Sequence, residues 1–138
     1  MAGEHSELIG RIYAAWNRGD VDGVVECCSA DAEVRPFLSD LAGSVYRGHE
    51  GIHRWYADAN DVWDRLLAEP EEVIEDGDRV LIRVHAKAHG SESGIDVDAD
   101  IVHLALVEDG RIARIDGFAS EQDARGAVAE GWPAAAAG

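Results

Sequence analysis

The chain has 138 residues, with 12 basic and 28 acidic side chains, so its formal net charge is -16. This length predicts one domain, residues 1–138, which buries roughly two thirds of its unfolded surface. Such an acidic surface repels phosphate backbones and anionic lipid, and we therefore expect neither nucleic acid nor a membrane as a partner.

Further features of the sequence point to a cytoplasmic protein. The N-terminus has no basic region followed by an apolar run, and no apolar stretch approaches the ~20 residues of a membrane span. The two cysteines, Cys27 and Cys28, are adjacent. We expect them to be reduced residues of a helix, because a bridge between neighbours is strained.

The first half of the chain predicts three helices. Apolar residues at helical spacing indicate a helix over residues 7–17, and a short second helix over residues 21–28 follows Asp20, which can cap it. A short strand over residues 32–37 and a loop come next. A third helix is predicted over residues 50–67, with an apolar stripe that belongs by default to the core.

The second half changes to the period of two that is typical of strands. Strands are predicted over residues 71–75, 79–88, 95–107 and 111–118, and the turn Glu108-Asp109-Gly110 joins the last two into a central hairpin, the floor of a pocket. A final helix is predicted over residues 121–130, after Ser120. Residues 131–138 are expected to form a flexible tail, from which Trp132 could dock back on the body.

These elements form an α+β arrangement, with helices on one side of a bent, mostly antiparallel sheet. Four stretches, at residues 13–20, 30–34, 46–52 (with Trp55-Tyr56) and 108–112, resemble the nuclear transport factor 2-like superfamily, and within it the SnoaL-like proteins. The resemblance covers residues 5–130. It implies a cone-shaped, strongly curved sheet wrapped around a long helix, with a deep pocket between them and a homodimer as the expected assembly.

The ketosteroid isomerases of this superfamily use an acidic base and a Tyr–Asp oxyanion pair. Aligned through residues 17–20, the three functional positions fall on Ile12, Pro36 and Val102. Since the functional groups are missing, ketosteroid isomerisation by that mechanism is not expected. The same alignment implies that Val102, Asp98 and Asp100 face the cavity.

Asp98 and Asp100 are therefore the leading candidates for catalytic carboxylates. At positions i and i+2 of a strand they lie about 7 Å apart, and if both are desolvated one acquires a raised pKa and can act as general acid or base. The alternative is that both lie at the solvated rim of the cone.

A second candidate group consists of His103 and Asp116, with His85, Arg83 and Arg114 on neighbouring strands. In SnoaL-like cyclases a His on the penultimate strand and an Asp on the last one form the acid/base pair, and His103 and Asp116 occupy approximately those places. Simple alternation, however, puts them on the outer sheet face, where a structural or dimer-interface cluster is the alternative.

The pocket is expected to be lined by aromatic and aliphatic side chains: Tyr13, Trp16, Phe37, Trp55, Ile82, Val84, Val102 and Ile115. Neither a metal site nor a nucleotide loop is visible, so we expect no cofactor. Three functions stay open: a cofactor-free isomerase, lyase or cyclase acting on a small apolar oxygenated molecule, a noncatalytic small-molecule-binding or dimerising module, and a protein-interaction domain.

Overall fold

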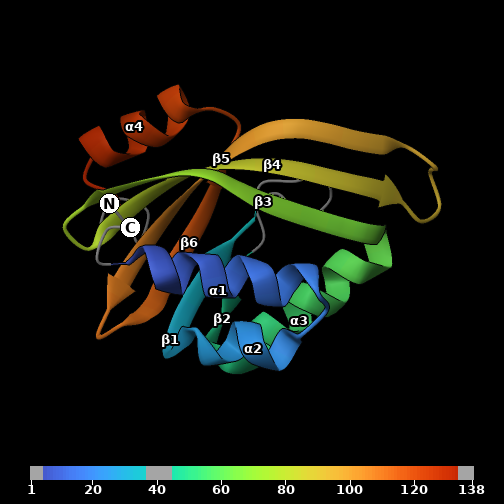
Figure 1. Cartoon of the computed structure of the whole chain (residues 1–138), viewed down its shortest axis with the longest axis horizontal. Coiled ribbons are helices and arrows are strands. Elements are labelled where there is room, and N and C mark those ends of the chain that lie inside the picture. Colours follow the sequence, from blue (N-terminus) through green and yellow to red (C-terminus); the bar gives the residue numbers. More distant parts are fainter. Residues whose placement is uncertain (1–4, 37–44, 134–138) are drawn as a thin grey trace.

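The computed structural model describes residues 5–36 and 45–133. Its centre is a six-stranded sheet with the order β2-β1-β6-β5-β4-β3 (Figure 1). All neighbouring strands are antiparallel except β1 and β6, which are parallel. In chain order the elements are α1 (Ser6–Asn17), α2 (Val21–Glu26), β1 (Cys28–Arg35), β2 (Tyr46–Arg47), α3 (Gly48–Val62), β3 (Trp63–Asp76), β4 (Arg79–Gly90), β5 (Asp96–Glu108), β6 (Arg111–Phe118) and α4 (Glu121–Ala129).

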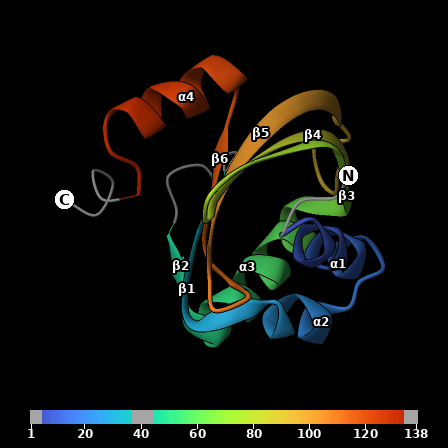
Figure 2. The ribbon, with the colours of Figure 1, turned by 60° about the vertical axis from the view of Figure 1, so that its left-hand side comes forward.

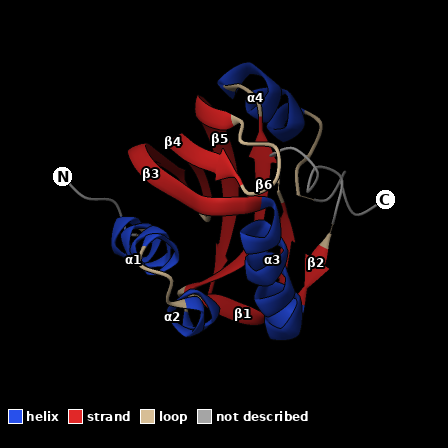
Figure 3. Ribbon diagram, turned by 90° about the vertical axis from the view of Figure 1, so that its right-hand side faces the viewer, coloured by secondary structure: helices blue, strands red, loops and turns tan. Residues whose placement is uncertain are grey.

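The sheet is strongly curved, and its two faces carry different helices (Figures 2 and 3). The sequence predicted all helices on one side of the sheet. Helices α1, α2 and α3 do lie together on the concave side, but α4 packs on the convex side, which corrects the prediction for this helix. The alternation of the strands explains both positions. Ile82 and Ala105 point into the large core on the concave side, while Leu81 and Leu104 point into a second core with Ala124 of α4.

The predicted central hairpin is present, with β5 and β6 paired around Asp109 and Gly110. Both turn residues have positive φ, 52° and 75°, as a tight turn between twisted strands requires. Gly110 adopts this conformation without a steric cost because it has no Cβ.

The third helix ends earlier than predicted, at Val62 rather than at residue 67. Trp63 has an extended backbone (φ -120°, ψ 131°) and pairs with Gly90, which starts the long strand β3. Pairing with β4 satisfies the backbone groups of residues 63–67 and outweighs their helical spacing of apolar residues. Pro70 fits within β3 because this strand is at the sheet edge, where a missing N–H is tolerated.

Among the described helices, none is long and apolar enough to cross a membrane.

Candidate functional site

A cavity of about 70 Å³ lies between the concave face of the sheet and the helices α1 and α3. Its lining is almost entirely apolar. It is formed by Ile12, Tyr13, Trp16, Val24, Val34, Arg35, Pro36, Trp55, Leu66, Ala68, Ala86, Ile101, His103, Ile115 and Gly117.

Tyr13 and His103 form the polar pair of this cavity. Tyr13 belongs to the buried face of α1, and His103 projects from β5 on the side of the sheet that α1 covers. The Tyr13 hydroxyl is hydrogen-bonded to His103 Nδ1, and the two rings stack with centroids 5.8 Å apart and planes inclined by 16°. Two segments 90 residues apart in sequence therefore meet at one hydrogen bond.

Both members of the pair are uncharged at neutral pH. Burial raises the pKa of the Tyr13 hydroxyl above its ordinary value, because a phenolate would be poorly solvated there. Burial also lowers the pKa of His103 to about 4, against a smaller opposing effect of the Asp116 charge. A protonated phenol is a good donor, so the favoured arrangement has Tyr13 donating to Nδ1 and the imidazole proton on Nε2.

The Nε2 atom of His103 makes no hydrogen bond to the part of the chain that the structure describes. His103 is half-buried and lines the cavity, so its remaining surface is available to a bound molecule. In the favoured tautomer this surface presents an N–H donor to an oxygen atom of a ligand.

Hydrogen bonds fix the aromatic wall and the adjoining backbone. The rings of Trp16 and Trp55 pack with centroids 4.5 Å apart, and Trp16 Nε1 donates to the Leu66 carbonyl over 2.9 Å. The Asn17 side chain donates to the Ala68 carbonyl and accepts from the Ala68 N–H, each over 2.8 Å. Helix α1 is thereby attached to β3 at the cavity, which holds the lining in a defined shape.

Asp98 and Asp100 do not face this cavity, which corrects their predicted position. Their side chains are 64% and 80% exposed, and they lie on the convex face with His85. The register decides this, because His103 pairs with Ile82 and Ile101 with Val84, and these residues belong to the concave side. The intervening acids therefore point to the solvated side of the sheet.

The same register corrects part of the predicted lining. Val102 lies in the second core, under α4, and so faces away from the cavity. Ile82 and Val84 belong to the concave core but not to the cavity surface, whereas Tyr13, Trp16, Trp55 and Ile115 do line it. The predicted lining residue Phe37 lies outside the described residues.

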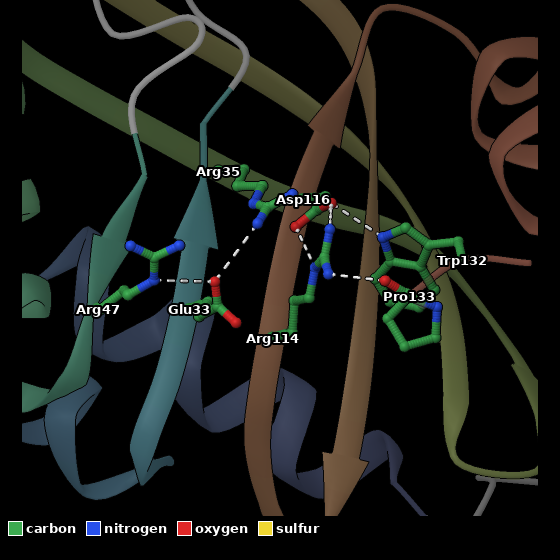
Figure 4. Close-up of polar contacts among 7 residues, drawn as sticks. All are labelled: Glu33, Arg35, Arg47, Arg114, Asp116, Trp132 and Pro133. Atoms are coloured by element: carbon green, nitrogen blue, oxygen red, sulfur yellow. Dashed lines mark hydrogen bonds and ion pairs between the residues drawn. The ribbon is translucent and has the colours of Figure 1, made fainter. Parts of the chain in front are cut away.

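Asp116 is also separated from His103, because it lies on the convex face of β6 (Figure 4). Its carboxylate accepts from Arg114 Nε over 3.0 Å, from Arg114 Nη2 over 2.7 Å and from Trp132 Nε1 over 2.9 Å. Arg114 Nη1 donates to the Pro133 carbonyl over 2.9 Å. Asp116 thus anchors the segment after α4, and Trp132 does dock on the body.

The Tyr13–His103 pair was not predicted as a unit. The available signal was the alternation in residues 95–105, where aliphatic side chains share one parity with His103 and three acids share the other. Carboxylates in such a pattern belong on the solvated face. The partner of His103 came from α1, which no local pattern in β5 can indicate.

The fold is that of solved nuclear transport factor 2-like proteins. The chain belongs to the SnoaL-like domain family, whose model matches residues 9–115.

An uncharacterised protein of Mycobacterium tuberculosis is 30% identical over 114 residues, which cover 81% of this chain and 86% of that protein. Among solved structures, TerC co-crystallised with polyporic acid is 25% identical, with a TM-score of 0.76 and coverage of 90% of this chain and 97% of that one. A putative polyketide cyclase from Sinorhizobium meliloti is 26% identical, with a TM-score of 0.67 and coverage of 80% and 93%.

Proposed function

We propose that this protein binds a small, largely apolar, oxygen-containing molecule in the cavity and acts on it as a cofactor-free isomerase, lyase or cyclase. The observation that carries the proposal is the hydrogen-bonded pair of Tyr13 and His103 at an otherwise almost entirely apolar surface. An apolar lining with few placed polar groups is typical of small-molecule sites. Two neighbours add support, since one was co-crystallised with polyporic acid and the other is named a putative polyketide cyclase.

The role of His103 follows from its neutral state. Its Nε2–H group would donate to a carbonyl or enolic oxygen of the substrate and stabilise negative charge that develops there. If the proton is transferred fully, Nδ1 takes the Tyr13 proton in exchange. The raised pKa of Tyr13 opposes that exchange, so hydrogen bonding to the developing oxyanion is the larger contribution.

The cavity size limits the ligand. Its volume of about 70 Å³ is below the ~150 Å³ of an apolar cavity that accepts benzene. A ring-sized substrate therefore requires that a lining side chain move, and Trp55 is the natural candidate because it is only partly buried. A cationic substrate would lose its hydration without a compensating ion pair, because no carboxylate lines the cavity among the described residues.

The experiment follows deuterium incorporation into 2-cyclohexenone in D₂O by proton NMR, because a donor to the carbonyl oxygen accelerates enolisation while a buffer base takes the carbon-bound proton. We expect exchange above the buffer rate, a fall of about 10²-fold or more in His103→Gln, and a smaller fall in Tyr13→Phe. The matched control is His53→Gln on α3, where the side chain is 50% exposed. Full exchange in His103→Gln, with its fold intact, would overturn the assignment.

A noncatalytic binding module is the second candidate, and two specific observations favour it. No carboxylate lines the cavity among the described residues, and His103 with a pKa of about 4 is a weak base. This candidate predicts no deuterium exchange in the wild type, together with binding of 2-cyclohexenone that weakens in His103→Gln. Calorimetry on the same variants measures this binding, and the presence or absence of deuterium exchange in the wild type separates the two candidates.

The homodimer and the cytoplasmic location stay predictions from the sequence. Light scattering after size exclusion tests the first of them. A dimer gives about twice the chain mass of 14.8 kDa.

A further inference from the structure

A histidine lies among three carboxylates on the convex face, on the opposite side of the sheet from the cavity. His85 projects from β4, Glu71 from β3, and Asp98 and Asp100 from β5. One ligand atom from each of Glu71, His85 and Asp100 lies within 4.8 Å of the other two. Metal–ligand bonds of about 2.0–2.2 Å separate two ligands of one ion by at most about 4.4 Å, so small side-chain rotations bring all three within reach of one ion.

A β-bulge helps to create this arrangement. His85 is directly opposite Asp100 on β5 and opposite Glu69 on β3. The register of β3 and β4 then shifts between Pro70 and Glu72, and Glu71 is the unpaired residue within that shift. An extra residue of this kind re-aims a side chain, and here it brings the Glu71 carboxylate next to His85 and Asp100.

Asp98 contacts the other ring nitrogen of His85. Its Oδ1 atom lies 2.7 Å from Nε2, while Nδ1 lies 2.9 Å from Asp100 Oδ1. In the metal-free chain both ring nitrogens of His85 have a carboxylate acceptor, and Nδ1 donates to Asp100. A metal ion would replace the proton on Nδ1, while the Asp98 carboxylate keeps the proton on Nε2. This is the arrangement of metal-binding histidines, which donate their second N–H to a carboxylate.

The negative charge of this group is not balanced by nearby basic side chains in the described part of the chain, which favours binding of a cation. Among the described residues, His85 is the basic side chain within ion-pair distance of Asp98 and Asp100, and no such partner is found for Glu71. The nearby Arg83 is already engaged with Glu72 over 3.0 Å and with Glu121. Three carboxylates thus share one imidazole.

We propose that Glu71, His85 and Asp100 bind a divalent transition metal ion, with Asp98 as the positioning residue that orients His85. One imidazole nitrogen and two carboxylate oxygens suit Zn²⁺, and water would complete a four-coordinate sphere. The site is independent of the cavity and of the chemistry proposed for it.

The test is calorimetric titration of the full chain, freed of metal by a chelator, with ZnCl₂ in 0.15 M NaCl, which suppresses binding to the acidic surface in general. We expect one ion per chain, with affinity lowered about 100-fold in His85→Gln and about 10- to 100-fold in Asp98→Asn. In the wild type, NMR of the histidine nitrogens should place the zinc-induced shift at Nδ1 of His85. These side chains are half-buried or exposed, so the variants should fold.

The matched control is His89→Gln. His89 lies four residues further along β4 on the same face, with Asp96 at 2.6 Å, but it is not part of the three-residue ligand group. We expect its affinity for Zn²⁺ within about threefold of the wild type. Equal losses in His85→Gln and His89→Gln, or no loss in His85→Gln, would overturn the proposal in favour of a diffuse ion atmosphere.

Discussion

His103 shows how strongly the environment of a single residue decides its chemistry. His85 and His103 carry the same imidazole side chain in two different surroundings. His85 lies on the convex face within ion-pair distance of Asp98, whereas His103 lies in the apolar cavity beside Tyr13. At the first position, the hydrogen bond to Asp100 and the charge of Asp98 raise the pKa of His85 and favour its charged form. At the second, loss of solvent favours the neutral form, so the two histidines are suited to different roles although both lie on the same sheet.

This neutral state predicts a pH-dependent contribution of His103 to stability. Its pKa of about 4 in the folded chain lies below the ordinary value of 6.5. Between these values the unfolded chain binds a proton that the folded chain does not, so the contribution is fully present above pH 6.5 and is lost as the pH falls to 4. The shift corresponds to about 3 kcal/mol.

Urea unfolding at pH 7 and pH 4.5 measures this contribution. We expect the wild type to lose about 2 kcal/mol more of its unfolding free energy over this interval than His103→Gln does, because the variant has no group to titrate there. His53→Gln should behave as the wild type. Parallel losses in the wild type and His103→Gln would show that His103 is not held neutral by burial.

At the scale of elements, the convex face depends on a buried ion pair. Arg114 and Asp116 are consecutive outward-facing residues of β6, with side chains only 5% and 7% exposed. The Arg114 guanidinium lies over the Trp132 ring, 5.5 Å from its centroid. Together with the contacts to Trp132 and Pro133, this pair holds the segment after α4 against β6 (Figure 4).

Asp116→Ala should therefore be strongly destabilising. It leaves a buried guanidinium and the Trp132 indole N–H without their shared acceptor, which costs about 3–5 kcal/mol. The double variant Arg114→Met, Asp116→Leu removes both charges and should recover most of the loss, since apolar replacements of buried ion pairs are often neutral. Urea midpoints of the three proteins give the comparison, and a double variant as unstable as Asp116→Ala would contradict this account.

At the scale of the whole molecule, the dominant electrostatic feature is the net charge of -16. Repulsion among like charges destabilises the compact state, and added salt screens it. Ion pairs such as Arg125 with Glu121 act in the opposite sense, but exposed pairs contribute little.

We therefore expect the melting temperature to rise by a few degrees between 20 mM and 500 mM NaCl, as a gain of about 1 kcal/mol would produce in a domain of this size. Chloride is preferable to sulfate, which stabilises proteins by exclusion from their surface. A melting temperature that falls with salt would mean that attractive ion pairs outweigh the repulsion.

Periodicity, turn chemistry and capping determined most of the elements of this protein from its sequence. Residues 7–17 have a clear helical period, and residues 79–88 and 111–118 have the period of two of a strand. The Asp109-Gly110 turn joins the predicted strands 95–107 and 111–118. These are local properties, because backbone geometry repeats every 3.6 or 2 residues. The acidic charge and the resemblance to the superfamily are likewise readable without a structure.

Only the tertiary structure decided which face of β5 meets the cavity and where α3 ends. If the pairing of β5 with β4 shifted by one residue, every side chain of β5 would move to the opposite face of the sheet. The register with β4 therefore decides that His103 faces the cavity and Asp100 faces solvent. The Tyr13–His103 pair and the group of Glu71, His85 and Asp100 have the same origin. Each joins residues that are distant in sequence, and pairing of strands and packing of helices bring them within hydrogen-bonding or ligand distance.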